Sequence, residues 1–366
     1  MSGRVALDLS CLEVHPETGV ERYARRLAET LPRVADDLEF TLVVRSDGPS
    51  PVIHPGARLL TVHSRLPRAV WREAALPGEL MRRGIPLLHA PVAAIPLRSK
   101  LTRVATIHDV PPAGGPDGEG YLSRNRLRML HAAGAADAIV VPSRATRDAL
   151  LEIVPGVSDR VHVIPHGVDP DFRPEGVPLD RRRYGIPEGP YLLWVGTIRR
   201  RKDPMVLIRA FVRLMQKEER DLRLIMCGDL RVDHEELYEP LVAAGLEERL
   251  ILPGYVYRED LPDLYREAEA LVVPSRLEGF GMCALEAMAC ARPLVVSRDP
   301  ALLELTGDAA LSFEIGEEED LTAVLERLLD DEDLRRRLGE RGRERAAACS
   351  WEASARAHAE LYRSLL

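Results

Sequence analysis

The stretch ALVVPSRLEGFGMCALEAMACARPLVVS, residues 270–297, decides the fold. It begins with an apolar run typical of a buried strand, ALVVP, and ends with another, PLVVS. Between them, after Gly281, apolar side chains recur at helical spacing, namely Met282, Leu285, Met288 and Ala289. Short strands that alternate with helices in this way are typical of a parallel α/β sheet.

Two carboxylates interrupt this apolar stretch. Glu278 precedes the predicted helix in a glycine-rich turn, and Glu286 falls in the first turns of the helix. An unpaired carboxylate in such surroundings is costly, so Glu286 is expected to have a partner. That partner is either another part of the protein or a bound ligand.

The same alternation continues along almost the whole chain and predicts two consecutive doubly wound α/β domains that face each other across a cleft. In the first half the predicted strands are Arg4–Ser10, Thr41–Val44, Leu59–Val62, Pro86–His89, Val104–His108, Ala138–Val141 and Arg160–Pro165, with a helix from Val20 to about Val34. In the second half they are Tyr191–Ile198 and the runs RLIMCG, LILPGYV, ALVVP, PLVVS and ALSF, with a helix that starts at Asp203 and Pro204 and a charged helical segment over residues 317–349.

The domain boundary is predicted between these halves, where residues 166–190 are dense in Gly and Pro and have no sustained period. The predicted parts are a domain at 1–168, a linker at 169–190, a domain at 191–349, and a last helix at 350–366 capped by Ser350. Ligands of such folds bind at the carboxyl ends of the strands. This rule predicts His108, Gly196 and the segment 278–286 on one rim of the cleft.

Composition and charge exclude several classes of protein. A chain of 366 residues with net charge −8 is suited to two domains, and its acidity argues against general nucleic-acid binding. Five cysteines without metal or disulfide spacing predict reduced thiols in a cytosolic protein. The chain shows neither a signal peptide nor the ~20 apolar residues of a membrane span. We therefore expect a cytoplasmic protein that is soluble or peripheral to the inner face of a membrane.

One part of the first half is basic: Arg65, Arg68, Arg72, Arg82, Arg83, Arg98, Lys100 and Arg103 are opposed only by Glu73 and Glu79. This run is either an ordinary solvated face or a patch that binds an anionic membrane or a phosphate-bearing acceptor.

A set of motifs, in order and nearly end to end, resembles one family. The motifs are TGVERYARRLAETL, ATIHDV, AIVVPSRATRDAL, VHVIPHGVDPDF, VGTIRRRKDPMVLIRAF, LPGYVYREDLPDLYREAEALVVPS, SRLEGFGMCALEAMACARPLVVS and SWEASARAHAELY. The chain resembles a retaining glycosyltransferase of the GT-B fold, family 4 (group 1). The resemblance implies an N-terminal acceptor-binding domain, a C-terminal domain that binds a nucleotide-sugar donor, and a last helix that returns to the N-terminal domain.

The resemblance also implies roles for individual residues. It assigns the donor diphosphate to Arg201 and Lys202, the ribose hydroxyls to Glu286, and a place beside the donor sugar to Glu278 and His108. The implied catalytic residues are His108, Glu278, Arg201 and Lys202. The implied donor-binding residues are Gly19, Gly196, Thr197, Arg201, Lys202, Tyr255, Val256, Glu278, Gly279, Phe280, Gly281, Met282 and Glu286.

General chemistry agrees with these assignments. A departing diphosphate gains charge, which preorganised donors stabilise. The backbone that enters the helix after Gly281 is a ready anion site, and Gly19 permits close backbone approach. The alternatives are a surface run of arginines at 199–201, salt bridges within the domain for Glu286, and a structural histidine at 108.

The sequence also departs from the family pattern. Cys283 and Ala284 stand where proline and an aliphatic residue are common, Ala291 replaces a frequent glycine, and Thr197 replaces a frequent arginine. Two Asp-x-Asp matches, at 169–171 and 331–333, lie where no metal site is expected. We therefore expect neither a metal nor another cofactor.

The resemblance predicts transfer of a hexose (mannose, rhamnose, glucose or N-acetylglucosamine type) from a nucleoside-diphosphate sugar to a glycan or lipid-linked acceptor, in polysaccharide or glycoconjugate biosynthesis. Two rivals stay open, a sugar-nucleotide epimerase of the same fold and a non-catalytic sugar-nucleotide-binding protein. The base, the sugar, the acceptor and the oligomeric state are not readable. Acceptor choice is expected in loops at 63–83 and 111–126.

Overall fold

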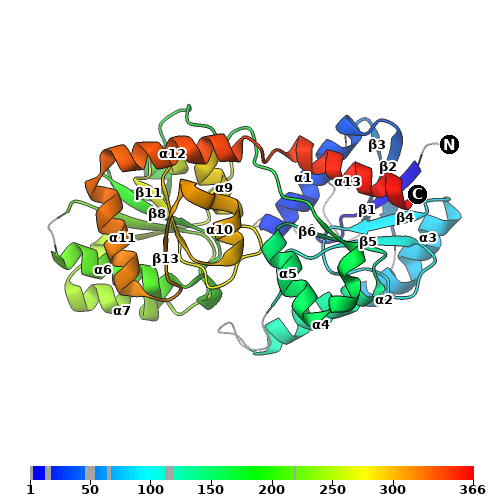
Figure 1. The fold of residues 1–366 in the computed structure, drawn as a ribbon, viewed down its shortest axis with the longest axis horizontal. Helices are drawn as coiled ribbons and strands as arrows, with labels where there is room; N and C mark the ends of the chain where they lie inside the picture. The colour runs from blue at the N-terminus through cyan, green and yellow to red at the C-terminus, as the bar shows by residue number, and fades with distance from the viewer. Residues whose placement is uncertain (1–2, 13–17, 46–53, 64–66, 112–118, 218–219) are drawn as a thin grey trace. The chain divides into compact units, whose positions relative to one another are not determined.

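The computed structural model divides the chain into two compact units, residues 1–167 with 349–366, and residues 168–348 (Figure 1). It describes residues 3–12, 18–45, 54–63, 67–111, 119–217 and 220–366. The described strands form a seven-stranded parallel sheet in the first unit, in the order β3-β2-β1-β4-β5-β6-β7. In the second unit they form a six-stranded parallel sheet, in the order β10-β9-β8-β11-β12-β13. The predicted pair of doubly wound α/β domains is confirmed.

The first unit is built on alternating strands and helices. Its strands are β1 (Gly3–Asp8), β2 (Leu38–Arg45), β3 (Ala57–Val62), β4 (Leu87–Ala90), β5 (Thr102–Thr106), β6 (Ala138–Val141) and β7 (Val161–Val163). Its helices are α1 (Gly19–Val34), α2 (Arg68–Val70), α3 (Leu76–Arg82), α4 (Glu119–Ala135), α5 (Arg144–Ile153) and α13 (Trp351–Leu365).

The second unit follows the same plan. Its strands are β8 (Tyr191–Val195), β9 (Arg223–Cys227), β10 (Leu250–Gly254), β11 (Ala270–Val273), β12 (Leu294–Ser297) and β13 (Leu311–Phe313). Its helices are α6 (Pro204–Lys217), α7 (His234–Ala244), α8 (Leu261–Glu267), α9 (Met282–Ala289), α10 (Pro300–Thr306), α11 (Glu318–Asp330) and α12 (Glu332–Ala346).

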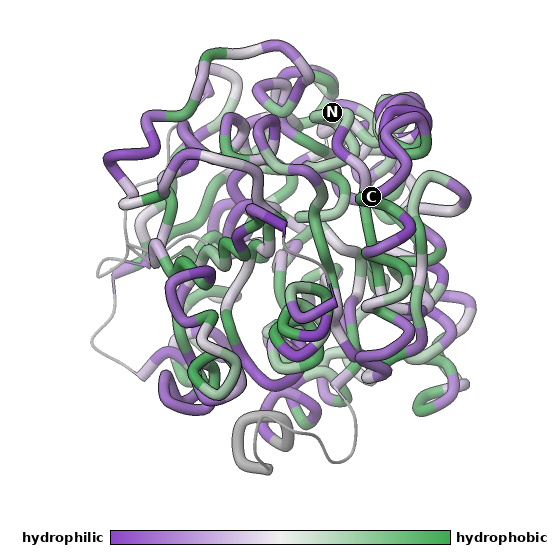
Figure 2. The backbone as a smooth tube through the Cα atoms, turned by 90° about the vertical axis from the view of Figure 1, so that its left-hand side faces the viewer, coloured by the Kyte–Doolittle hydropathy of each residue, from purple (hydrophilic) through white to green (hydrophobic). Residues whose placement is uncertain are grey.

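Burial explains why these sequences form these elements. Strands β6, β11 and β12 are buried along their whole length, as expected of runs covered on both faces of a parallel sheet. Around them the helices bury one face, and Trp194, Phe211 and Leu325 join the core of the second unit. In Figure 2 many helical coils alternate between hydrophobic green and hydrophilic purple, the pattern of amphipathic helices.

The last helix belongs to the first unit, as the predicted fold has it. Helix α13 packs against α1 (Figure 1), and Ser350 caps it by accepting a hydrogen bond from the Ala353 amide at 3.0 Å. A buried chain of hydrogen bonds joins it to β4, β5 and α1. The links are Tyr362 Oη–His89 Nδ1 at 2.6 Å, His89 Nε2–Thr106 Oγ1 at 2.8 Å, Thr106 Oγ1–Tyr23 Oη at 2.9 Å, Tyr23 Oη–His358 Nε2 at 2.8 Å and His358 Nδ1–Ser354 O at 2.7 Å.

The chain leaves the first unit and returns to it at neighbouring points. A Cβ atom on Gly167, the last residue before the exit, would lie 2.2 Å from the backbone nitrogen of Trp351. This contact is too close for any side chain. Glycine at 167 therefore lets the outgoing and returning segments pack backbone against backbone.

The structure corrects several expected boundaries. Residues 169–190 belong to the second unit rather than to a separate linker, because the Leu179 amide donates to Glu267 at 2.7 Å and Arg181 pairs with the same carboxylate at 2.8 Å. Their Gly and Pro residues therefore mark irregular backbone that is nonetheless packed. Strand β5 ends at Thr106, so His108 lies in the following loop. The charged segment 317–349 contains two helices, α11 and α12.

Within the described ranges, every helix is too short or too polar to cross a bilayer.

Candidate functional site

The second unit brings Arg201, Lys202 and Glu278 together where its strand order reverses. Strands β8 and β11 are neighbours, but the chain continues from β8 toward β9 on one side and from β11 toward β12 on the other. The short helical turn Arg200–Lys202 follows β8, and Glu278 follows β11. Such a reversal leaves a crevice at the carboxyl ends of the two strands, which is the usual ligand site of open α/β sheets.

The Glu278 carboxylate is held from two sides. Lys202 Nζ donates to Glu278 Oε1, and Ser275 Oγ donates to the same oxygen at 2.7 Å. Arg201 Nη1 lies 3.4 Å from the Leu277 carbonyl oxygen, so its guanidinium also borders this turn. The Lys202 and Glu278 side chains are only 16% and 9% exposed, which makes the pair largely shielded from water.

Electrostatics keep the Glu278 carboxylate ionised. Burial raises the pKa of Glu278, but the positive charges of Lys202 and Arg201 outweigh it and hold the pKa below its usual value. The carboxylate is therefore charged at neutral pH. An ammonium group has three N–H donors, so Lys202 can retain Glu278 and still donate to a bound anion.

The turn after Glu278 depends on glycine. Gly281 has φ 95°, and a Cβ atom there would lie 2.6 Å from Leu302 Cδ2. Phe280 beside it is buried, and helix α9 begins directly afterwards at Met282. Backbone N–H groups at such a helix start carry partial positive charge. The arrangement puts Gly279–Met282 next to the Lys202–Glu278 pair.

Glu286 has partners inside the second unit. Tyr265 Oη donates to Glu286 Oε2 at 2.9 Å, and Arg258 Nη1 lies 3.7 Å from Oε1. Arg258 also pairs with Asp169, the first acid of one Asp-x-Asp match. These contacts are the ones expected if Glu286 forms salt bridges within its own domain instead of binding a ligand. A carboxylate has about four acceptor positions, so they are also compatible with added ligand hydroxyls.

The other expected donor-binding residues lie at the ends of strands or helices. Gly196 follows β8 with φ 147°, and Thr197 comes next. Tyr255 and Val256 follow β10, the former 38% exposed and the latter buried. Gly19 lies in the first unit, where it begins α1 after the Thr18 cap.

His108 is fixed inside the first unit. Its Nε2 lies 2.8 Å from the Pro91 carbonyl oxygen, which can only accept, so Nε2 carries the proton. Its Nδ1 then accepts from His166 Nε2 at 3.3 Å. Burial lowers the pKa of His108, so the ring is neutral at physiological pH. The imidazole is oriented as an acceptor at Nδ1.

Four residues of these networks were absent from the sequence prediction: Ser275, Tyr265, Arg258 and His166. Their roles depend on contacts between distant segments, which no local pattern announces. A fifth residue, Asp299, accepts a hydrogen bond from the Glu278 amide at 3.1 Å. Its place at a helix start was readable, because Asp-Pro at 299–300 repeats the pattern of Asp203-Pro204. Among the departures from the family pattern, Ala291 has φ 53°, which explains why glycine is frequent there.

Family models match both halves of the chain. The family model described as glycosyl transferases group 1 matches residues 177–345, and the model described as Glycosyltransferase Family 4 matches residues 18–172. The D-inositol 3-phosphate glycosyltransferase of Kineococcus radiotolerans is 34% identical over 63% of this chain and 57% of its own length. The match thus spans little more than half of that relative.

Other relatives are matched more completely. O-antigen chain mannosyltransferase B of Escherichia coli is 30% identical over 73% of this chain and 71% of its own length. Two solved structures share the fold over nearly the whole of both chains. Sucrose-phosphate synthase from Thermosynechococcus elongatus has a TM-score of 0.77 at 24% identity with 99% of each chain covered, and Anabaena HepE in complex with UDP and glucose has 0.76 at 19% with 100% covered. The chain belongs to the group 1 glycosyltransferases of glycosyltransferase family 4, with the GT-B fold.

Proposed function

We propose that this protein is a retaining hexosyltransferase that moves a hexose from a nucleoside-diphosphate sugar to a glycan or lipid-linked acceptor. The observation that carries the proposal is the shielded Lys202–Glu278 pair, bordered by Arg201, at the reversal point of the second sheet. A cationic cluster at the carboxyl ends of strands suits a diphosphate, and a neighbouring carboxylate suits sugar hydroxyls. The relative HepE, whose solved structure holds UDP and glucose, supports a nucleotide-sugar donor.

The same residues suit the departure of a diphosphate. As the bond between the anomeric carbon and the diphosphate breaks, negative charge grows on the leaving oxygen. Arg201, Lys202 and the backbone N–H groups at the start of α9 are donors fixed in advance for that charge. We propose that these groups suffice and that no metal is needed.

The proposed stereochemical course is retention. The acceptor hydroxyl attacks the sugar on the face from which the diphosphate departs, and its proton passes to the departing phosphate. Glu278 is bound to Lys202 and Ser275, so we assign it to sugar hydroxyls rather than to nucleophilic attack. We place the neutral His108 ring, which Pro91 and His166 hold through its two nitrogens, beside the donor sugar.

The first test is a thermal-shift panel of UDP, GDP, ADP and dTDP with their sugars, with and without EDTA. A ligand at 100 times its Kd stabilises by about 2.7 kcal/mol, which corresponds to a rise of roughly 5–10 °C. We expect one base to give such a shift and EDTA to leave it unchanged. A panel without any shift would contradict the proposed donor site, and a shift abolished by EDTA would contradict metal independence.

A second measurement separates transfer from binding. Transfer assays with the stabilising sugar nucleotide, followed by NMR of the anomeric proton in the product, should show the donor's configuration retained. Inversion would contradict the proposed course. Tight binding without any turnover would favour the non-catalytic sugar-nucleotide-binding protein, and a new sugar epimer on the nucleotide would favour the epimerase.

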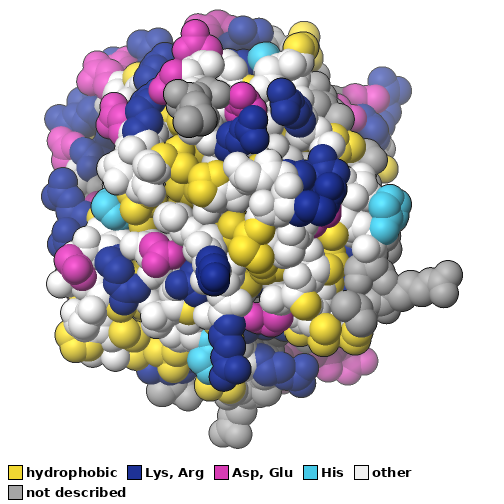
Figure 3. All heavy atoms as spheres, turned by 90° about the vertical axis from the view of Figure 1, so that its right-hand side faces the viewer, with side chains coloured by type: hydrophobic (Ala, Val, Ile, Leu, Met, Phe, Trp, Pro, Cys, Tyr) yellow, Lys and Arg dark blue, Asp and Glu magenta, His cyan; other side chains and the backbone are white. Residues whose placement is uncertain are grey.

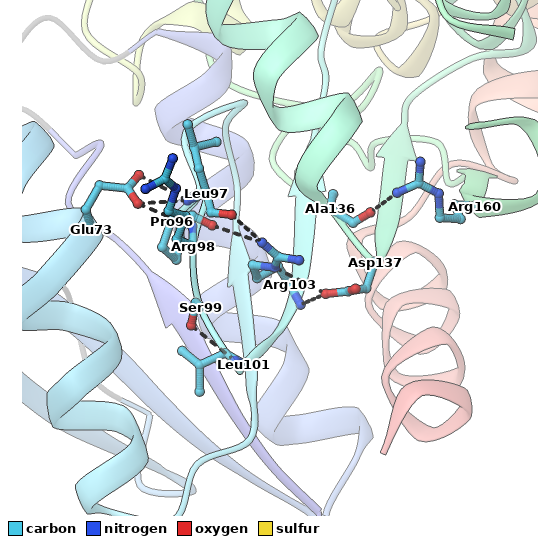
Figure 4. A network of polar contacts seen from close by, with 10 residues as sticks. All are labelled: Glu73, Pro96, Leu97, Arg98, Ser99, Leu101, Arg103, Ala136, Asp137 and Arg160. Atoms are coloured by element: carbon cyan, nitrogen blue, oxygen red, sulfur yellow. Dashed lines mark hydrogen bonds and ion pairs between the residues drawn. The ribbon is translucent and has the colours of Figure 1, made fainter. Parts of the chain in front are cut away.

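A lipid-linked acceptor would bring the first unit to a membrane, and one loop there is suited to that contact. Residues 97–100 (Leu-Arg-Ser-Lys), here the Leu97 loop, carry an exposed Leu97 and the exposed cations Arg98 and Lys100. The Glu73 carboxylate accepts from the Leu97 amide at 3.0 Å, and Arg103 Nη1 donates to the Leu97 carbonyl at 3.0 Å (Figure 4). The loop is therefore fixed in this exposed position.

Other members of the predicted basic run serve the first unit itself. Arg82 and Arg83 pair with Glu79, and Arg103 pairs with Asp137 at 3.3 Å. Arg65 lies outside the described residues. In Figure 3, which faces the side of the first unit, Lys and Arg side chains in dark blue lie among hydrophobic side chains in yellow. We propose that the Leu97 loop contacts anionic lipid.

A further inference from the structure

Asp299 lies between β12 and α10 and is 1% exposed. Its Oδ1 accepts hydrogen bonds from the amides of Ala301 at 3.0 Å and Leu302 at 3.1 Å. These two bonds are those of an ordinary helix cap, and they occupy one carboxylate oxygen. A serine at this position would serve the same purpose.

The second oxygen of Asp299 reaches a different part of the chain. Oδ2 accepts a hydrogen bond from the backbone N–H of Glu278 at 3.1 Å. Two residues before Asp299, the Ser297 hydroxyl donates to the Ser275 carbonyl at 2.5 Å. The β12–α10 junction thus binds both ends of the turn 275–278. Ser297 binds the carbonyl at its start, and Asp299 binds the amide at its end.

This second bond acts on the residue whose carboxylate borders the proposed diphosphate site. The Glu278 side chain is directed by Lys202 and Ser275, but its Cα position depends on the backbone of the turn. We propose that Asp299 is a positioning residue: through its Oδ2 it sets the backbone of Glu278, and so the place of the Glu278 carboxylate beside the donor sugar. This inference rests on the proposed function.

The chain offers a variant that separates the two bonds. Asp299→Ser retains an oxygen for the cap of α10 but lacks the second oxygen for Glu278. Asp331→Ser is the matched control, because Asp331 caps α12 by accepting from the Leu334 amide at 2.7 Å and lies in a different helix start. Both variants lose a capping aspartate, and only the first loses the contact with the site.

The assay measures turnover of UDP-glucose and GDP-mannose, as release of the nucleoside diphosphate, together with the Kd of UDP and GDP. Misplacement of a reacting geometry by about 1 Å costs up to about 100-fold in rate. We expect Asp299→Ser to lower kcat by about 10- to 100-fold and to change the nucleotide Kd by less than about threefold. Asp331→Ser should retain the wild-type kcat and lose less thermal stability than Asp299→Ser, because the Asp331 side chain is 47% exposed and accepts from one amide.

A double-variant cycle tests the route of the effect. If Asp299 acts through Glu278, Asp299→Ser should reduce kcat by less than about twofold in a Glu278→Gln background, because the positioned group is already lost. Additive losses would overturn the inference, and so would a wild-type kcat for Asp299→Ser. Should Asp299→Ser fail to fold, Asp299→Asn carries the same test, because its amide faces the Glu278 N–H with a donor.

The outcome is distinguishable from failure of the proposed function. If the wild-type chain binds UDP or GDP and turns over its sugar while Asp299→Ser does so equally well, only the positioning role is wrong. If the wild-type chain does neither, the proposed function fails and this inference fails with it.

Discussion

Lys202 illustrates how a single buried charge serves two purposes. Its ammonium group is bound to Glu278 and is largely shielded from water, so removal of that charge leaves a shielded carboxylate without its bonded cation. We expect Lys202→Met to lower the free energy of unfolding by about 2–3 kcal/mol, as measured by urea denaturation. The same variant should weaken nucleoside-diphosphate binding at least about tenfold, because a charge-assisted hydrogen bond is lost.

Lys217→Met is the matched control for this prediction. Lys217 also forms an ion pair, with Glu326 at 2.7 Å, but its side chain is 59% exposed. Exposed pairs contribute little, so we expect a change below about 0.5 kcal/mol and unaltered nucleotide binding. Equal effects of the two variants would show that the Lys202–Glu278 pair has no special role.

At the residue scale, some members of the candidate site could be predicted from the sequence and others could not. The roles of Arg201, Lys202 and Glu278 were predicted from the family resemblance. Each lies a few residues after an apolar strand, which agrees with the rule that ligands bind at the strand ends of one sheet. Ser275 and Asp299 could not be assigned, because their bonds to Glu278 depend on how a turn and a helix start pack together. Local patterns carry no information on such packing.

At the scale of elements, helix α13 is joined to the first unit by a chain of buried hydrogen bonds in which each donor and acceptor can be assigned. The Ser354 carbonyl only accepts, so His358 Nδ1 carries a proton and His358 Nε2 accepts from Tyr23. Tyr23 then accepts from Thr106, and Thr106 accepts from His89 Nε2. His89 Nδ1 therefore accepts from Tyr362. Both histidines are therefore neutral in the folded first unit.

This arrangement predicts acid sensitivity of the first unit. Burial lowers the pKa of His358 to about 4 and places that of His89 and His166 well below the usual value. Between pH 6.5 and 4 the unfolded chain binds more protons than the folded chain, so stability is complete above pH 6.5 and is lost as pH falls. His358 alone should cost about 2 kcal/mol at pH 5.

Urea denaturation at pH 7.5 and pH 5.0, followed by circular dichroism, checks this expectation. His358→Gln removes one of the titrating groups and should show a smaller difference between the two pH values. His131→Gln changes an exposed histidine of α4 and should behave as the wild type does. A free energy of unfolding that is the same at both pH values would contradict the assignment of neutral histidines.

At the scale of the whole molecule, the alternation of strands and helices was sufficient to predict two doubly wound sheets. It was not sufficient to assign residues 169–190, because a packed irregular segment and a free linker share the same Gly and Pro content. The same alternation left the basic run ambiguous, because the pairing of Arg82 and Arg83 with Glu79 depends on helix α3, which the sequence pattern did not predict.

The proposed membrane contact is a property of the whole surface and is tested on the full chain. Co-sedimentation with vesicles of phosphatidylcholine alone and of phosphatidylcholine with phosphatidylglycerol should show binding only to the anionic vesicles. Arg98→Glu with Lys100→Glu should reduce that binding at least about tenfold, at about 1 kcal/mol per cation near the surface. Arg182→Glu with Arg327→Glu, two cations of the second unit, is the control and should leave binding unchanged. Equal binding to both vesicle types would contradict the proposal.

The close backbone approach of Gly167 and Trp351 has a consequence for protein engineering. The chain leaves the first unit and returns to it at adjoining points. The second unit is therefore a domain inserted at one position of the first unit. Insertion of a domain is tolerated where the two ends of the insertion site lie close together, as they do here. We therefore expect that the second unit can be exchanged for another by two cuts, at 167–168 and 348–349, while the order of the first unit's elements along the chain stays the same.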